Sequence, residues 1–204
     1  MAVYLDNNAT TALDERVLQA MLPYMGQVTG NPSSVHRFGR LQRDAIEQAR
    51  ESVARLVGAR AEQVVFTSGG TESNNLLING FYQQGRDSRI AVSALEHMSL
   101  LEPAKNLGAM VDIIQADENG HINRSALEQV MDEKTSLVSV MTANNETGVI
   151  QDLSPLVDFA AENNCFFHTD ATQAAGKIAL DFAGSGMHAM TISAHKLYGP
   201  VGVG

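Results

Sequence analysis

The 204-residue sequence predicts an α/β protein whose sheet is mostly parallel and covered by helices on both faces. Short apolar stretches rich in β-branched residues alternate with longer stretches in which apolar residues recur every three or four positions. The short stretches are nearly continuously apolar, which is typical of strands buried on both faces of a parallel sheet. No repeat, low-complexity tract or linker interrupts this alternation, so we expect a single domain over residues 1–204.

Two helices are predicted ahead of the first strand. Apolar residues between positions 17 and 25 indicate the first helix. The second is expected over about residues 38–57 and should stop at Gly58, because glycine commonly ends helices. One face of the second helix carries an apolar stripe that we expect to be buried. The stripe consists of Phe38, Leu41, Ala45, Ala49, Val53 and Leu56. Later helices are expected from Thr71 and over residues 97–107, 125–131 and 154–163.

Six short stretches are predicted to be strands, and four of them end in polar clusters. The strand candidates are residues 64–67, 90–93, 111–115, 137–142, 166–169 and 190–193. The polar clusters lie at residues 68–72, 143–146, 170–173 and 193–196. In open parallel sheets, ligands bind just beyond the carboxyl ends of the strands. The sequence therefore predicts a site at which these clusters converge.

Composition restricts the classes of partner and compartment. The net charge of −9 argues against nucleic acid and anionic membranes as partners, since both favour basic surfaces. Cys165 is the only cysteine, so an internal disulfide and a cysteine metal cluster are excluded. The six histidines show no HExxH spacing, and we expect no zinc site. Because neither a signal-like leader nor a long apolar run is present, we expect a cytoplasmic protein.

Two segments suit the phosphate and the ring nitrogen of a cofactor. Residues 68–74 read SGGTESN between a predicted strand and a predicted helix, where unpaired N–H groups can bind phosphate. Taken alone, this segment is better explained as an ordinary turn with Thr71 as the helix cap. Asp170 ends a buried strand, where a carboxylate needs a partner. That partner is either a pyridinium nitrogen or the start of the next turn.

Lys196 is the strongest single candidate for chemistry. It follows an apolar strand directly, and a lysine with a lowered pKa can act as a Schiff-base nucleophile. Ser193 and His195 beside it could donate hydrogen bonds to a phosphate. A surface lysine at a turn is the alternative, but the other polar strand ends favour the functional interpretation. His97 could stack on an aromatic ring, and Asn145 could form a hydrogen bond with a hydroxyl on that ring. Taken singly, His97 is more simply the start of a helix, and Asn145 is more simply part of a turn.

Six motifs together resemble the cysteine desulfurases of the NifS/IscS-like group in the class V aminotransferase family. They lie at residues 4–11, 31–39, 66–74, 144–148, 168–173 and 193–200, in the order found in that family. The resemblance covers the whole chain. It implies the large domain of a fold-type I enzyme that depends on pyridoxal 5′-phosphate (PLP).

The resemblance also implies a role for each matching residue. Lys196 would form the Schiff base with PLP, Asp170 would pair with the pyridinium nitrogen, and His97 would stack on the ring as a second catalytic residue. Gln173 and Asn145 would contact the phenolic oxygen of the ring. The phosphate would be held by Gly70, Thr71, Ser193 and His195.

The family reaction converts L-cysteine to L-alanine and passes the sulfur, as a persulfide on an enzyme cysteine, to iron–sulfur cluster or thio-cofactor assembly. A sulfur-acceptor or scaffold protein and a homodimer are implied as partners. Family members are about twice as long, so the resemblance places the small domain, the substrate-binding arginine and the persulfide cysteine outside this chain. Cys165 precedes a predicted strand and is expected to be buried and inert. The 204-residue chain alone is therefore expected not to be fully active.

Two alternatives stay open at this point. The first keeps PLP but changes the reaction, as in a selenocysteine lyase or another class V aminotransferase-like enzyme, and predicts turnover of a different amino acid. The second is a truncated, non-catalytic fragment, which predicts no bound cofactor or a cofactor without turnover.

Overall fold

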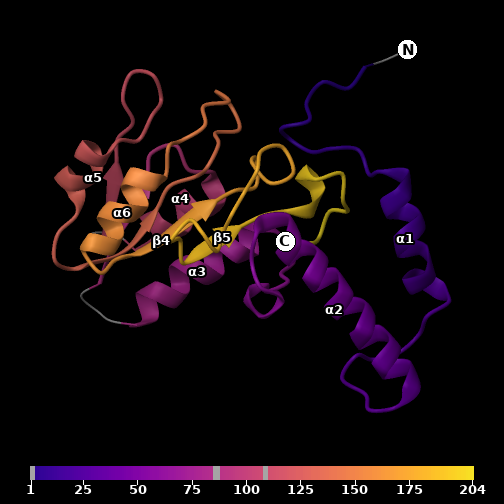
Figure 1. Ribbon diagram of the computed structural model, residues 1–204. Helices are drawn as coiled ribbons and strands as arrows, with labels where there is room; N and C mark the ends of the chain where they lie inside the picture. Colours follow the sequence, from indigo (N-terminus) through magenta and orange to yellow (C-terminus); the bar gives the residue numbers. More distant parts are fainter. Residues whose placement is uncertain (1–2, 85–87, 108–109) are drawn as a thin grey trace.

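The computed structural model describes residues 3–84, 88–107 and 110–204, and it confirms the α/β class (Figure 1). One sheet of five parallel strands crosses the molecule in the order β2-β1-β3-β4-β5. The strands are β1 (Arg89–Ser93), β2 (Val111–Ile114), β3 (Thr135–Ser139), β4 (Phe166–Asp170) and β5 (Ala189–Thr191). Because the strands are parallel, all their carboxyl ends meet at one edge of the sheet.

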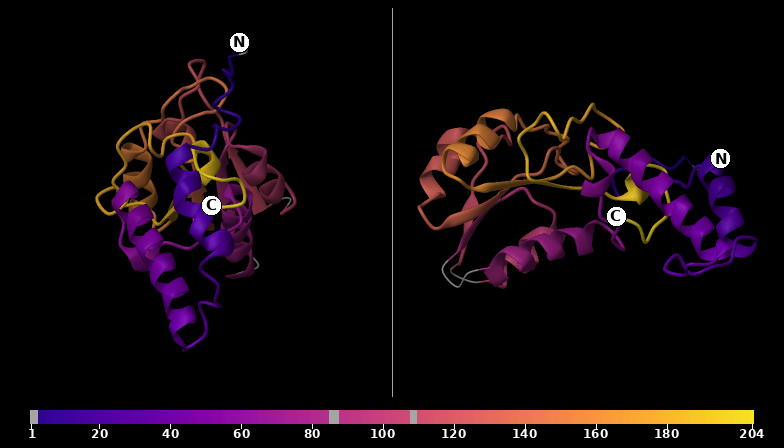
Figure 2. Two further views of the ribbon diagram at one scale, coloured as in Figure 1. Left: turned by 90° about the vertical axis from the view of Figure 1, so that its right-hand side faces the viewer. Right: turned by 60° about the horizontal axis from the view of Figure 1, so that its bottom comes forward.

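Helices cover both faces of this sheet, as Figure 2 shows in its right-hand view. One face packs against α5 (Arg124–Val130) and α6 (Ser154–Glu162), and the other against α3 (Gly70–Gln84) and α4 (Met98–Lys105). Successive residues of β1 show the alternation. Ala91 is buried in the core beneath α5 and α6, whereas its neighbour Ile90 is buried in the core beneath α3 and α4. The nearly continuous apolar strands therefore reflect burial on both sides.

The helix boundaries follow local signals in the sequence. Gly58 ends α2 (Arg37–Val57) in the left-handed region at φ 68°, as the sequence predicts. Asn123 begins α5, where its side-chain oxygen accepts a hydrogen bond from the backbone N–H of Ala126 at 2.9 Å. His97 caps α4 in the same way, with its ring nitrogen Nδ1 accepting from the backbone N–H of Ser99 at 3.1 Å.

The predicted burial of the stripe on α2 is wrong in this structure. Helices α1 (Glu15–Gly26) and α2 extend away from the sheet (Figure 1). Phe38, Leu41 and Leu56 of the stripe are 59%, 45% and 43% exposed. Periodicity shows which face of a helix is apolar, but burial also needs a neighbouring element on that face. On this face, α2 lies opposite α1 across an open hollow instead of against a packed layer.

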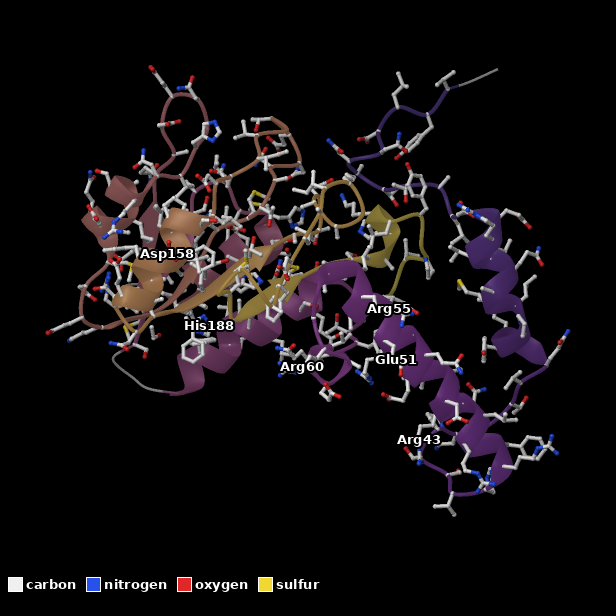
Figure 3. All side chains as sticks on the ribbon, in the orientation of Figure 1. Arg43, Glu51, Arg55, Arg60, Asp158 and His188 are labelled. Atoms are coloured by element: carbon white, nitrogen blue, oxygen red, sulfur yellow. The ribbon has the colours of Figure 1, made fainter. Side chains whose placement is uncertain are left out.

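The other face of α2 is charged. Figure 3 shows Arg43, Glu51 and Arg55 along the length of the helix. The apolar face shares an open hollow of about 820 Å³ with α1. This hollow is lined mainly by Val17, Ala20, Met21, Tyr24, Ala45, Ile46 and Ala49.

Within the described ranges, no helix is both long enough and apolar enough to cross a membrane.

The strand predicted over residues 64–67 is also wrong. These residues run in an irregular segment after the 3-10 helix η1 (Ala61–Gln63) and pair with no strand of the described sheet. Thr67 alone exchanges backbone hydrogen bonds with Gly204, at 2.8 and 3.0 Å. An apolar cavity of about 560 Å³ lies between this segment, α3 and β5. β-branched and aromatic residues favour an extended conformation, but a strand also requires a partner beside it.

Candidate active site

One cavity of about 540 Å³ lies at the carboxyl edge of the sheet, and all nine residues singled out from the sequence line it. They are Gly70, Thr71, His97, Asn145, Asp170, Gln173, Ser193, His195 and Lys196. The volume falls within the range of roughly 300–1,000 Å³ that is usual for small-molecule sites. The predicted convergence is thus present in the geometry, while the role of each residue stays a prediction.

Lys196 lies in a short 3-10 helix, η3 (Ala194–Lys196), that follows β5. Its Nζ donates a hydrogen bond to the backbone carbonyl of Asn8. Burial lowers the pKa of Lys196, and the positive charge of Lys177 lowers it further, whereas Asp170 and Asp6 act in the opposite direction. A lowered pKa increases the neutral fraction of the amine at a given pH, and only the neutral amine is nucleophilic.

Asp170 ends β4 and is 6% exposed. Its Oδ2 accepts a hydrogen bond from Asn74 Nδ2 at 2.9 Å, and its Oδ1 accepts one from the backbone N–H of Thr172 at 2.9 Å. These donors fix the carboxylate and offset the cost of burying it. Asn74, fully buried on α3, was not singled out from the sequence although it closes the 68–74 motif.

His168 lies behind Asp170 on β4 and is almost fully buried. Its Nδ1 shares a hydrogen bond with Ser139 Oγ at 2.8 Å, and its Nε2 shares one with Thr191 Oγ1 at 3.0 Å. Burial lowers the pKa of His168 to about 4, although the nearby Asp170 acts to raise it. His168 is therefore neutral near pH 7 and leaves the charge of Asp170 uncompensated from that side.

Four of the lining residues form a corner suited to a phosphate: Gly70, Thr71, Ser193 and His195. Gly70 and Thr71 begin α3, and the first N–H groups of a helix have no intrahelical partner. A methyl group placed on Gly70 would lie 3.6 Å from Thr172 Oγ1 and 3.7 Å from Ser193 Cβ, and so would occupy this corner. The side chain of His195 is held by a 3.1 Å hydrogen bond between its Nδ1 and Thr10 Oγ1.

His97 and Asn145 reach the cavity from the loops after β1 and β3. His97 is both a helix cap and a lining residue, so the two interpretations of its sequence position are compatible. A 3.2 Å hydrogen bond from Asn144 Nδ2 to the carbonyl of Leu95 ties the two loops together. Asn145 in turn accepts a hydrogen bond at its backbone oxygen from Asn8 Nδ2 at 3.1 Å.

The N-terminal segment also contributes to the cavity. The residue pattern alone did not predict this contribution. Asp6, Asn8 and Ala9 line the cavity. The backbone carbonyl of Asn8 accepts hydrogen bonds from Lys196 Nζ and, at 2.8 Å, from Gln173 Nε2. Asp6, Asn8 and Ala9 belong to the motif at residues 4–11, to which the sequence assigns no contact with the site. A backbone carbonyl has no signature in the sequence, so only the fold reveals this contact.

The segment at residues 31–36, by contrast, lies at the far end of α2 (Figure 1) and is absent from the cavity lining. His36 caps α2 there, its Nδ1 accepting from the backbone N–H of Gly39 at 3.3 Å. In the loop before this helix end, the side-chain oxygen of Asn31 accepts a hydrogen bond from the backbone N–H of Ser33 at 2.9 Å.

The residues of the cavity fit PLP. An amine on Lys196, a buried carboxylate on Asp170 and an anion-binding helix start correspond to the aldehyde, pyridine nitrogen and phosphate of that cofactor. Thr172 Oγ1 adds independent support, because it is buried in the cavity wall and has no hydrogen-bond partner in the described part of the chain. A buried hydroxyl without a partner is costly, and a bound ligand would satisfy it.

A parallel sheet that carries this set of groups at its carboxyl edge defines the class, namely the PLP-dependent enzymes of fold type I. The family description "Aminotransferase class-V" matches residues 3–204, and the chain belongs to this family.

Known relatives and solved structures agree with this placement. The chain is 43% identical over 207 residues to "Cysteine desulfurase IscS" of Dictyoglomus turgidum, and 43% identical over 208 residues to "Cysteine desulfurase" of Homo sapiens. Both alignments cover 99% of this chain but only 52% and 46% of those relatives, so the chain spans about half their length.

Two solved structures show the same fold. A structure described as "NifS-like protein" superposes with a TM-score of 0.95 at 37% identity, covering all of this chain and 58% of the other. A structure described as "SspA in complex with cysteine" superposes with a TM-score of 0.94 at 32% identity, covering 99% of this chain and 60% of the other.

Glu96 is a further buried acid beside the site that the sequence did not reveal. It is 4% exposed, and its Oε1 accepts a 2.6 Å hydrogen bond from the backbone N–H of Met141. Its Oε2 has no hydrogen-bond partner among the described residues. Burial raises the pKa of Glu96 well above its ordinary value, and the negative charge of Asp170 raises it further.

The raised pKa of Glu96 predicts a pH-dependent stability. The folded state binds the proton more tightly than the unfolded state, so the free energy of unfolding should fall as pH rises above the ordinary carboxyl range. In Glu96→Gln the amide oxygen can still accept the hydrogen bond from the backbone N–H of Met141, and the side chain can no longer ionise. We expect it to exceed the wild type in stability by roughly 1–3 kcal/mol near pH 8 and to lose this advantage near pH 4. Urea unfolding at a series of pH values tests this, with the exposed Glu102→Gln as control.

Proposed function

We propose that this chain is the cofactor-binding large domain, residues 1–204, of a PLP-dependent cysteine desulfurase. The enzyme would convert L-cysteine to L-alanine and pass the sulfur to an enzyme cysteine as a persulfide. The convergence of Lys196, Asp170 and the Gly70–Ser193 corner on one cavity supports this proposal most directly. The identity of 43% to relatives named cysteine desulfurases favours that reaction over other class V chemistry.

Each residue of the cavity has a chemical role in the proposed reaction. PLP, when bound, supplies a conjugated ring that withdraws electrons from the α-carbon of an amino acid attached to it. Asp170 would hold a proton on the ring nitrogen, and the start of α3 with Ser193 and His195 would hold the phosphate. Lys196 Nζ would hold the cofactor covalently, and as a free amine it would take the proton from the substrate α-carbon. His97, held in the cavity wall by its bond to Ser99, would stack on the ring.

Sulfur transfer needs a thiolate that this chain does not supply. The thiolate attacks the sulfur of L-cysteine, so an S–S bond forms and the bond from sulfur to the β-carbon breaks, leaving its electron pair on carbon. A proton delivered to that carbon, together with the return of a proton to the α-carbon by Lys196, completes L-alanine. Cys165 is 2% exposed, and burial raises the pKa of its thiol to about 12, as expected for an inert residue.

Partners and location follow from the same proposal. We infer a homodimer that delivers sulfur to an acceptor or scaffold protein of iron–sulfur cluster or thio-cofactor assembly. The small domain, the substrate-binding arginine and the persulfide cysteine would lie in the half of the relatives' length that this chain does not span. We propose the cytoplasm as its location, although one relative, from Dictyostelium discoideum, is named mitochondrial.

The test is a cofactor and product assay on the purified chain. We expect added PLP to give a visible absorption band, and borohydride to fix the cofactor to the peptide containing Lys196. L-Cysteine should then perturb this band more than L-alanine or L-aspartate does, and alanine should form when a thiol is supplied. Pyridoxamine phosphate and a 2-oxo acid would indicate an aminotransferase instead. A folded chain that fixes no cofactor would contradict the proposal.

Thr172 provides a prediction for cofactor affinity. Its buried hydroxyl lacks a partner and faces the phosphate corner, so Thr172→Val should weaken PLP binding roughly twofold to tenfold, the effect of one hydrogen bond. Thr172→Ser should retain the affinity. Pyridoxal, which lacks the phosphate, serves as the control ligand in a fluorescence titration. An equal loss of pyridoxal affinity would assign the hydroxyl to the ring instead of the phosphate.

A further inference from the structure

A second lysine stands behind the cavity and is connected to Lys196 through three hydrogen bonds. Lys177 Nζ donates to Gln173 Oε1 at 2.8 Å, Gln173 Nε2 donates to the carbonyl of Asn8 at 2.8 Å, and Lys196 Nζ donates to that same carbonyl. Lys177 itself does not line the cavity. We propose that Lys177 is a positioning residue that fixes the amide of Gln173 as a donor toward the cofactor and places a second positive charge beside Lys196.

The orientation of the Gln173 amide is determined by its two partners. The oxygen and nitrogen of an amide are otherwise hard to distinguish, and their assignment depends on the surrounding groups. Lysine can only donate, so Gln173 Oε1 must face Lys177. A carbonyl can only accept, so Gln173 Nε2 must face Asn8. Both ends require the same orientation, and turning the amide over would break both bonds.

This orientation leaves one N–H of Gln173 for the cavity. Nε2 carries two hydrogens, and the carbonyl of Asn8 uses one of them. Gln173 lines the cavity, and its Nε2 has no second hydrogen-bond partner among the described residues, so the second hydrogen is available to a ligand. A ligand at this corner is therefore selected for an acceptor oxygen. If the cofactor is PLP, on which this inference rests, the phenolic oxygen of the ring is such an acceptor, and a donor favours its ionised form.

Lys177 also acts on Lys196 through charge. The other charged or titratable groups near Lys196 are Asp170 and Asp6, which raise its pKa, and the cavity residues His97, His195 and Glu146. Burial lowers the pKa of Lys196 most, and the positive charge of Lys177 is the second influence that lowers it. Removing the positive charge of Lys177 should raise that pKa, so that less of the Lys196 amine is neutral at a given pH.

The test uses the unloaded chain and its few amines. The sequence contains four lysines, Lys105, Lys134, Lys177 and Lys196, so competitive acetylation with mass spectrometry can follow each one across a pH series. In Lys177→Met we expect acetylation of Lys196 near pH 8 to fall at least about twofold, with its profile shifted to higher pH. Lys177→Arg keeps the charge and the donor and should restore the profile. Lys105→Met, on the surface of α4, is the matched control and should leave it unchanged.

A second measurement tests the Gln173 amide. In Lys177→Met we expect PLP affinity to fall roughly twofold to tenfold, because the Gln173 amide loses one of the two hydrogen bonds that hold it as a donor and keeps only the bond to Asn8. Lys177→Arg should again restore it. Lys177 is exposed, so Lys177→Met is expected to fold, and a thermal unfolding midpoint confirms this. A residue with a merely structural role at this turn would change that midpoint without moving the pH profile.

Failure of this inference differs from failure of the proposed function. If the wild-type chain attaches PLP to Lys196 but Lys177→Met leaves either the acetylation profile or the PLP affinity unchanged, Lys177 is not the positioning residue and the function stands. If the wild-type chain attaches no PLP, the proposed function fails. The acetylation profile then decides the inference alone: a shift reversed by Lys177→Arg supports it, and an unchanged profile overturns it.

Discussion

Lys196→Ala is expected to abolish covalent attachment of PLP and to lower alanine formation from L-cysteine by roughly 10²–10⁴-fold, the range for loss of a positioned acid–base group. Lys196 Nζ lies in the cavity, its pKa is lowered by burial and by Lys177, and no other lysine lines that cavity among the described residues. Borohydride reduction followed by peptide mapping measures the attachment, and alanine assay with an added thiol measures the turnover. Non-covalent PLP binding should survive, because Asp170 and the phosphate corner are retained.

Two further variants determine what a loss in Lys196→Ala means. Lys196→Arg keeps a positive charge but cannot form a Schiff base, so it should be as inactive as the alanine variant. Lys134→Ala removes an amine elsewhere on the chain and should behave as the wild type. A covalent label that appears on Lys177 in the wild-type chain would contradict the assignment, because Lys177 is the other lysine close to this cavity.

The sheet and most of its helices could be predicted because their signals are local. The apolar runs around Ile90 and Phe167 lie in parallel strands, and Gly58 ends α2 where a glycine was expected to. The same is true of the site residues at strand ends. Asp170 and Lys196 follow buried strands of one parallel sheet, so their convergence follows from topology once the strands are known.

What the sequence could not show depends on contacts between distant segments. Residues 64–67 have the composition of a strand but no neighbouring strand, and the stripe on α2 is apolar without being covered. The carbonyl of Asn8 reaches Lys196 across more than half the chain, and backbone groups leave no trace in a residue pattern. The same applies to Asn74 and Glu96, whose importance lies in their burial next to Asp170.

Asp170→Asn is the second change with a large expected effect. It keeps the size of the side chain and removes the negative charge that would hold a proton on the cofactor ring nitrogen. A charge-assisted hydrogen bond contributes about 1.5–3 kcal/mol, so we expect alanine formation to fall at least roughly 10–100-fold. PLP should still attach to Lys196, because Lys196 and the phosphate corner are unchanged.

The surroundings of Asp170 predict that this variant folds. Asn74 Nδ2 now donates to Asp170 Oδ2, while Asn74 Oδ1 is buried and has no partner among the described residues. If the side chain of Asn74 turns over, its oxygen can accept a hydrogen bond from the new amide, so this contact is kept at the cost of the bond from Asn74 Nδ2 to Ser99 Oγ. The backbone N–H of Thr172 keeps its acceptor on the other oxygen. The unfolding midpoint of Asp170→Asn should therefore lie close to that of the wild type.

Comparison with Asn74→Ala separates the effect of the negative charge of Asp170 from the effect of the orientation of its carboxylate. This variant leaves the carboxylate of Asp170 charged but removes one of the donors that hold it, so it should lower turnover less than Asp170→Asn and lower stability more. The reverse order would mean that orientation of the carboxylate outweighs its charge. Unchanged turnover in Asp170→Asn, with PLP attached to Lys196, would show that the cofactor does not use this carboxylate. Because His168 is neutral near pH 7 and supplies no compensating charge, such a result would leave the ring nitrogen without a charged partner on β4.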